Sequence, residues 1–359
     1  MIDFRYHLVS LISVFLALAV GIALGAGPLK ETIGDTLTGQ VDQLRAEKDA
    51  LRSDLDTQAS ELAAGNAYIA AAGAELVDGT LSDRRVAVVS LGTVDGDALT
   101  AVESQLTDAG ATVSAHVTLD EAWTSTDLRT FRQALSGSIL SYLDPQPADD
   151  ASVDTSLAEA LVQGLTGADP AQPDRLSSAA GTLLELLTSG DSPLVTFGEE
   201  ITTPADAVVL VAPTVAPDAV ATDATADADE LQAVLDAQIA LARVAQSRSE
   251  GAVVVDGPAT EGTLVAAIRA DEDAAAAVTT VSGADAIAGQ VSVPLALNAR
   301  IGGINGHYGY GEDLTTLPTT TTLPPVDRTP ASTGDVVDPG TDGTVDGAAG
   351  DGGEAGAEG

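Results

Sequence analysis

One long apolar segment opens the chain. No charged residue occurs from Leu8 to Leu29, and this run lies between Arg5 and Lys30. At 1.5 Å per residue, a helix of this length spans about 33 Å, which matches the roughly 30 Å hydrocarbon core of a bilayer. The pattern therefore predicts one transmembrane helix over residues 8–29.

The flanking charges predict how this helix is oriented. The α-amino group and Arg5 precede it, whereas the acidic residues Glu31 and Asp35 follow it closely. Because positive charge favours the cytoplasmic side, we expect residues 1–7 in the cytoplasm and the rest of the chain outside it. The alternative is a cleaved signal peptide, which typically has a shorter apolar region and an Ala-x-Ala cleavage site.

Small residues share one face of the predicted membrane helix. Ala17, Gly21 and Gly25 are spaced four positions apart, and a Gly-x-x-x-Gly pair lets two membrane helices approach closely. Gly21 and Gly25 are therefore candidate residues for self-association. The alternative is that the spacing only reflects how common glycine is in membrane helices.

The segment after the membrane helix has apolar residues at alternating three- and four-residue spacings. This heptad pattern predicts a coiled-coil helix, which we place at residues 32–78. Lys48 and Gln58 occupy two core positions, where polar residues weaken the interface but fix register or oligomer state. A membrane helix leading into a heptad helix favours a parallel dimer or trimer, and the alternative is an amphipathic helix packed on its own domain. The candidate oligomerisation residues of this heptad are Leu37, Val41, Leu44, Leu51, Leu55 and Leu62.

Residues 81–314 alternate between two hydrophobic periods. Short apolar runs rich in β-branched residues predict strands, and helical periodicity recurs between them. Nearly continuous apolar strands that alternate with helices are typical of a mostly parallel sheet covered on both faces. We therefore predict an extracytoplasmic α/β domain with a helical insertion at about residues 126–190. The predicted strands are 84–92, 111–119, 206–213, 251–258 and 277–283, and the predicted helices are 97–109, 226–248 and 262–273.

Residues 315–359 differ in composition from the domain. They are rich in Thr and Pro and then in Gly, Asp and Ala, contain no aromatic residue, and carry one basic residue, Arg328. Such a segment buries too little apolar surface to offset the entropy of ordering. We therefore expect a disordered, acidic C-terminal tail with a solvating role, the alternative being an O-glycosylated segment that extends towards a cell wall.

Composition excludes several kinds of site and partner. The chain has no cysteine, so disulfides and thiolate metal sites are excluded. Its formal net charge of −39 argues against nucleic acid as a partner, because nucleic acid is a polyanion. Sequence motifs of nucleotide-binding loops, serine hydrolases and zinc peptidases do not occur. We therefore expect a protein that is not an enzyme and holds no cofactor.

Few residues of the domain are candidates for a binding site. Open α/β sheets bind ligands beyond the carboxyl ends of their strands. Those ends offer Gly92, Thr93 and Asp95 after the first predicted strand, and Asp256 and Gly257 after a later one. The alternative is that these residues only form turns and cap helices.

The segment Gly302–Glu312 is rich in glycine and contains two tyrosines and His307. Glycine lets a backbone approach a ligand or surface closely, and aromatic side chains add contacts, whereas the alternative is a loose exit from the domain. We expect a flexible loop, in which His307 is the best candidate metal ligand. The other histidines are His7, at the membrane boundary, and His116, in a predicted strand.

The opening sequence resembles that of a known family. DFRYHLVSLISVFLALAVGIALGAGPL, followed by a heptad helix, is similar to the N-terminus of the mycobacterial-type copper transport protein B (MctB) family. The Gly-His-Tyr-Gly element at Gly306–Gly309 is similar to the C-terminal end of that family. The resemblance implies a single-pass envelope protein associated with copper tolerance, in a family described as forming a pore for copper efflux across an outer membrane.

The residue types offer few copper ligands. Copper(I) prefers thiolate and thioether ligands and copper(II) prefers imidazole, whereas this chain has no cysteine, one methionine and three histidines. We therefore expect copper as a transported ion handled by an oligomeric assembly, not as a bound cofactor. The alternative is an oligomeric, membrane-anchored envelope scaffold that binds other envelope proteins and transports no metal.

Overall fold

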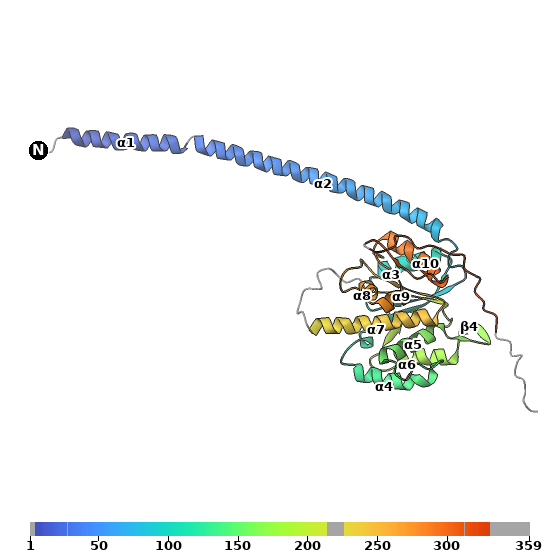
Figure 1. Cartoon of the computed structure of the whole chain (residues 1–359). Helices are drawn as coiled ribbons and strands as arrows, with labels where there is room; N and C mark the ends of the chain where they lie inside the picture. The colour runs from blue at the N-terminus through green and yellow to red at the C-terminus, as the bar shows by residue number, and fades with distance from the viewer. Residues whose placement is uncertain (1–3, 27, 214–225, 312, 331–359) are drawn as a thin grey trace, which may run out of the picture. The chain divides into compact units, whose positions relative to one another are not determined.

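A computed structural model describes residues 4–26, 28–213, 226–311 and 313–330 (Figure 1). The chain divides into two compact units, Met1–Ala72 and Gly73–Gly359. The first unit contains helix α1 (Phe4–Ala26) and most of helix α2 (Pro28–Val77). The last turn of α2 belongs to the second unit, an α/β domain.

Helix α1 confirms the apolar N-terminal helix. Its segment Phe4–Gly25 is long and apolar enough to cross a membrane, and none of it is buried within the chain. The helix begins four residues before the predicted start at Leu8 and ends at Ala26. Pro28 begins the next helix, as suits a first helical position, where no N–H partner is needed.

Helix α2 confirms that the heptad segment is helical. Its bounds, Pro28–Val77, include almost all of the predicted range 32–78. Pairing of this helix into a coiled coil stays a prediction. The apolar heptad residues Leu37, Val41, Leu44, Leu51, Leu55 and Leu62 are each between 41% and 67% exposed in the single chain.

The domain is built on a seven-stranded sheet with the order β5-β2-β1-β6-β7-β8-β9. All neighbouring strands are parallel except β5, which is antiparallel to β2. The order reverses between β1 and β6, as in doubly wound α/β folds. The strands are β1 (Arg85–Ser90), β2 (Thr112–Leu119), β5 (Val195–Phe197), β6 (Ala207–Val211), β7 (Ala252–Val255), β8 (Thr279–Val281) and β9 (His307–Tyr308).

Both faces of the sheet are buried, because successive strand residues point to opposite sides. In β1, Val86 and Val88 join the core beneath helices α3 (Gly96–Asp108) and α10 (Ile287–Ile301), whereas Ala87 and Val89 join the core on the other side. The predicted parallel α/β sheet covered on both faces is therefore confirmed. The second core is covered by α5 (Val153–Thr166), α6 (Ser178–Thr188), α7 (Ala226–Arg248), α8 (Leu264–Ala270) and α9 (Glu272–Ala277) (Figure 1).

The insertion between β2 and β5 is helical only in part. Helix α4 (Arg129–Ile139) and helices α5 and α6 agree with the prediction, and single 3-10 turns lie at Glu121–Trp123 and Leu140–Tyr142. A small antiparallel hairpin of β3 (Ala168–Asp169) and β4 (Gln172–Leu176) interrupts them. The carboxylate of Asp169 accepts the N–H of Ala171 at 2.8 Å, a local bond that favours this turn.

Helix α10 was not predicted. It is buried at ten of its fifteen positions and contains Pro294. A helix that is buried on nearly all sides carries no polar face, so it lacks the amphipathic period by which helices are recognised.

The C-terminal tail was predicted to start at Thr315, and this boundary is wrong. Residues 315–330, which we name the strap, lie along the domain and are hydrogen-bonded to it. Leu323 packs against the core formed with α3 and α10. A few long-range contacts to backbone groups hold the strap, and composition does not reveal such contacts. The rest of the expected tail, 331–359, lies outside the described residues.

Candidate functional site

His307 lies in strand β9 at one edge of the sheet, and not in a flexible loop as expected. Its Nδ1 lies 2.9 Å from the hydroxyl of Thr280, and its Nε2 lies 3.2 Å from the carbonyl oxygen of Ala275. Burial lowers the pKa of the imidazole, and the nearby charge of Arg269 lowers it further. The neutral ring therefore donates from Nε2 to the carbonyl and accepts at Nδ1 from the hydroxyl.

This arrangement occupies both ring nitrogens of His307. A copper ion requires a free nitrogen lone pair, and here the lone pair of Nδ1 is already hydrogen-bonded. Of the acidic neighbours expected from sequence, Asp313 is exposed and Glu312 lies outside the described residues. Within the part of the chain that the structure describes, no group of three or more His, Asp or Glu side chains is arranged to hold a metal ion.

The residues proposed from sequence lie in the turns that follow strands β1 and β7. Asp95 caps helix α3, because its Oδ1 accepts the N–H groups of Asp97 at 3.0 Å and Ala98 at 3.2 Å. Asp256 is 2% exposed. Its carboxylate accepts the N–H groups of Gly257 at 2.7 Å and Val265 at 3.2 Å. Both aspartates therefore have structural roles in the turns they occupy.

Burial raises the pKa of Asp256 to about 6, although the backbone N–H groups that it accepts oppose this rise. The cavity beside it, at the point where the strand order reverses, measures about 20 Å³ and is lined by Val94, Val211 and Gly257 among others. This volume has room for about one water molecule. Residues 214–225, which come after Pro213 in the sequence, lie outside the described residues.

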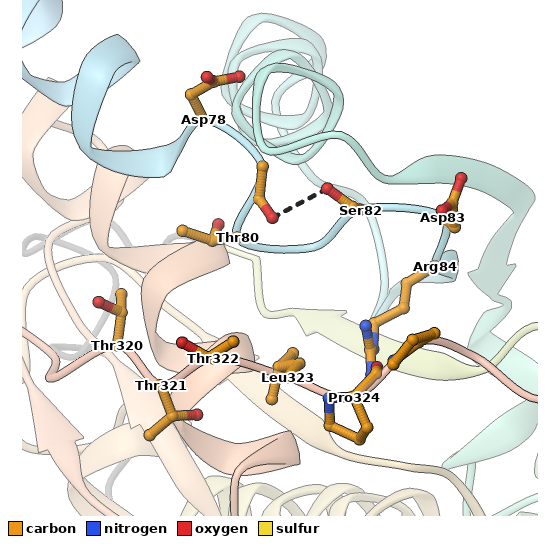
Figure 2. A pocket seen from close by; sticks show the side chains of 12 residues that line it. Asp78, Thr80, Ser82, Asp83, Arg84, Thr320, Thr321, Thr322, Leu323 and Pro324 are labelled. Atoms are coloured by element: carbon orange, nitrogen blue, oxygen red, sulfur yellow. Dashed lines mark hydrogen bonds between the residues drawn. The ribbon is translucent and has the colours of Figure 1, made fainter.

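A larger cavity lies between the strap and the turn that joins α2 to β1 (Figure 2). It measures about 490 Å³. The lining residues include Asp78 and Asp83, and serine or threonine residues of both segments. Oxygen ligands without thiolate, thioether or imidazole groups hold copper(II) weakly and copper(I) hardly at all. The cavity is lined by Asp78, Gly79, Thr80, Ser82, Asp83, Arg84 and residues 320–325.

Arg84 forms the floor of this region and is 3% exposed. Its Nε donates to Glu250 at 3.0 Å, and its Nη2 donates to the carbonyl oxygen of Pro324 at 3.0 Å. An ion pair between Arg328 and Asp206 follows further along the strap. Sequence reasoning missed these residues. The available signal was a pair of arginines, Arg84 and Arg85, at the start of the first strand of a chain with only 15 lysines and arginines.

The candidate oligomerisation residues all belong to the first unit. At Gly21 and Gly25, the position that a Cβ would take has no atom within 4 Å, so this face of α1 is open in the single chain. The heptad residues of α2 are likewise exposed. Self-association through either helix stays a prediction.

Comparison with known proteins identifies the family. The family model described as "Copper transport outer membrane protein, MctB" matches residues 1–319. The protein named copper transporter MctB of Mycobacterium tuberculosis (strain ATCC 25618 / H37Rv) is 31% identical over 320 residues, which cover 87% of this chain and 97% of the relative. The protein of the same name from Mycobacterium leprae (strain TN) is 31% identical over 326 residues, covering 88% of this chain and 99% of the relative. The chain therefore belongs to the MctB family of copper transport outer membrane proteins.

Proposed function

We propose that this protein serves copper homeostasis as an oligomeric component of the cell envelope, anchored by α1, and that copper passes it as a substrate. Family membership supports the copper role, since the relatives carry the name copper transporter. Helix α1 supports membrane anchoring.

The observation that carries the oligomeric part is the exposed apolar stripe of α2. Six large apolar side chains on one side of a 50-residue helix are between 41% and 67% exposed. Burying them against other chains removes this apolar surface from water, at about 25 cal/mol per Å². In an assembly of several chains, a path for copper can run between protomers, so that one protomer does not have to form the whole path.

The side chains of the domain support handling of copper without a tight site in one protomer. Both nitrogens of His307 are engaged in hydrogen bonds, and the large cavity beside the strap offers oxygen ligands. These features fit a transported ion better than a resident cofactor.

Copper tolerance of a deletion strain tests this function. Complementation with the full chain should restore growth in copper, whereas the double variant Leu44→Asp, Leu51→Asp should not, because two charges in the apolar stripe oppose association. The matched control is Ala46→Asp, Ser53→Asp, which places the same charges on the opposite face of α2 and should restore growth. A deletion strain with unchanged copper tolerance would instead favour the envelope scaffold.

We also propose that the N-terminus lies in the cytoplasm and the α/β domain outside it, from the charges that flank α1. Reporter enzymes fused after residue 65 test this orientation. A reporter that requires export should be active there, and a reporter that works only in the cytoplasm should be silent. Activity of the cytoplasmic reporter would contradict the proposal.

A further inference from the structure

The charges beside the apolar stripe indicate how two copies of α2 meet. We propose that α2 pairs with α2 of a second copy as a parallel, in-register, two-stranded coiled coil, in which Glu47 faces Arg52 of the partner subunit. This inference rests on the oligomeric part of the proposed function and adds the identity, direction and register of the partner helix.

The heptad fixes which residues flank the stripe. Leu44 and Leu51 are at d positions. The residue directly after each d residue is therefore at e, and the residue three positions after each d residue is at g. Every charged residue at e is basic and every one at g is acidic, and all of these side chains are exposed in the single chain. The e positions hold Arg45 and Arg52, and the g positions hold Glu47, Asp54 and Glu61.

This segregation of charge selects the direction of pairing. In a parallel pair, a g residue faces the e residue of the next heptad on the other helix, so Glu47 faces Arg52 of the partner subunit, and symmetry gives this pair twice. In an antiparallel pair, g faces g and e faces e, so that acidic residues meet acidic residues and arginines meet arginines. Like charges in those positions destabilise the antiparallel pair.

The polar core positions select the register. In register, Gln58 meets Gln58 of the partner subunit, and the two Lys48 side chains meet as like charges at a cost in stability. A shift by one heptad places Lys48 against an apolar residue of the stripe, which leaves its ammonium without a polar partner. A polar residue at an a position specifies register in this way. In register, Lys48 also lies beside Glu47 of the partner subunit, because g directly precedes a.

The core residues also favour two strands. Leu37, Leu44 and Leu51 occupy d positions, and two of the four a positions hold β-branched Val41 and polar Lys48, which favour dimers, beside Leu55 and Leu62. A parallel pair places both copies of α1 at the same end, as two anchors in one membrane require.

Single cysteines in the full chain test direction and register, because the protein has none of its own. After oxidation in native membranes, Leu37→Cys, Leu44→Cys and Leu51→Cys should each give a disulfide-linked dimer, since in-register pairing brings each position next to its own copy. The outer-face control Ser53→Cys should remain monomeric. An antiparallel pair brings only its central position next to itself, so cross-linking at one core position alone, or at none, would overturn the proposal.

Charge reversal tests the Glu47–Arg52 pair. Glu47→Arg and Arg52→Glu should each weaken the dimer on the order of tenfold, because two attractive contacts become repulsive. The double variant should restore the original dissociation constant, measured by sedimentation of the full chain in detergent. Failure to restore it, or a mass of three chains, would overturn the proposal. These readouts do not involve copper, so this inference and the proposed copper role can fail independently.

Discussion

Asn298 and Thr321 form a reciprocal hydrogen-bonded pair between helix α10 and the strap. The side-chain oxygen of Asn298 accepts the N–H of Thr321 at 2.7 Å, and its Nδ2 donates to the carbonyl oxygen of Thr321 at 3.0 Å. The same nitrogen donates to the carbonyl oxygen of Thr80 at 2.8 Å. One amide that is 1% exposed therefore joins α10, the strap and the turn after α2.

Substitution of Asn298 tests how much this junction stabilises the domain. Asn298→Ala leaves the N–H of Thr321 and two carbonyl oxygens without their partner, and each such buried group costs about 1–3 kcal/mol. Because the strap can move towards water, we expect a total loss of about 2–4 kcal/mol. Urea unfolding of the full chain in detergent measures this, with the single tryptophan, Trp123, as a buried fluorescent reporter.

Thr321→Val is the matched control. The hydroxyl of Thr321 is buried and has no hydrogen-bond partner among the described residues, and the backbone contacts to Asn298 do not involve it. Removal of an unpaired buried hydroxyl should leave stability unchanged or raise it slightly. Equal losses from both substitutions would mean that packing, and not the amide pair, holds the strap.

Truncation tests whether the strap belongs to the domain. A chain that ends after residue 314 lacks the Thr321 contacts, the bond from Arg84 to Pro324 and the Arg328–Asp206 ion pair. In this shortened chain, the guanidinium of Arg84 keeps its hydrogen bond to Glu250 but loses the carbonyl oxygen of Pro324 as an acceptor. We expect the melting temperature to fall by several degrees, in line with about 0.25–0.5 kcal/mol per degree for a domain of this size.

A chain that ends after residue 330 keeps all of these contacts and is the control. Its melting temperature should equal that of the full chain. Equal melting temperatures for the two truncated proteins would contradict a stabilising role of the strap. The family match ends at residue 319, so most of these strap contacts lie beyond the segment that identifies the family.

The pH dependence of stability should report Asp256. Its pKa is raised to about 6 from an ordinary value of 3.8, because burial disfavours the carboxylate. The folded state therefore binds this proton more tightly than the unfolded state, so stability falls as pH rises from about 4 to about 6. Two pKa units correspond to up to about 3 kcal/mol.

Asp256→Asn removes this titration while keeping a side chain of nearly the same shape. The difference in unfolding free energy between the original protein and this variant should change across pH 4–6 and stay constant above pH 7. Urea unfolding followed by Trp123 at each pH measures it. A difference that stays constant from pH 4 to pH 7 would show that Asp256 titrates normally.

The sequence predicts the sheet well because the signal is local. Strand β1 is a run of six residues in which Val86 and Val88 enter one core and Ala87 and Val89 enter the other, so a short apolar run is sufficient to recognise it. The order of the strands is a different matter. It depends on pairings between distant segments, such as β1 with β6, that no single segment encodes.

The strap and strand β9 were missed for the same reason. Asn298 and Thr321 are 23 residues apart, and the contacts of Thr321 use its backbone, which is the same for every residue type. Strand β9 contains two residues, and its pairing with β8 defines it. A glycine-rich segment with two tyrosines and a histidine gives no local sign of that pairing, so the sequence favoured a loop there.

The position of His307 leads to a direct prediction about copper. Because Thr280 and Ala275 occupy its ring nitrogens, copper(II) must displace at least one hydrogen bond to reach it, and the described residues contain no group of three or more His, Asp or Glu side chains arranged to hold a metal ion. We expect titration of the full chain in detergent with copper(II) alone at neutral pH to show no tight, stoichiometric binding. His307→Ala should leave both the isotherm and copper tolerance in cells unchanged.

His116→Ala is the matched control, because His116 lies in another strand, β2, where its Nε2 is 3.1 Å from a carboxylate oxygen of Glu103. If a tight isotherm is present in the original protein and in His116→Ala but lost in His307→Ala, then His307 is a copper ligand and its hydrogen bonds yield to the metal. That result would contradict the hypothesis of transport without a resident copper site. It would favour transport through a copper site on strand β9. Absence of tight binding in all three proteins, together with copper sensitivity of the deletion strain, would leave the assembly of several chains as the element that handles copper.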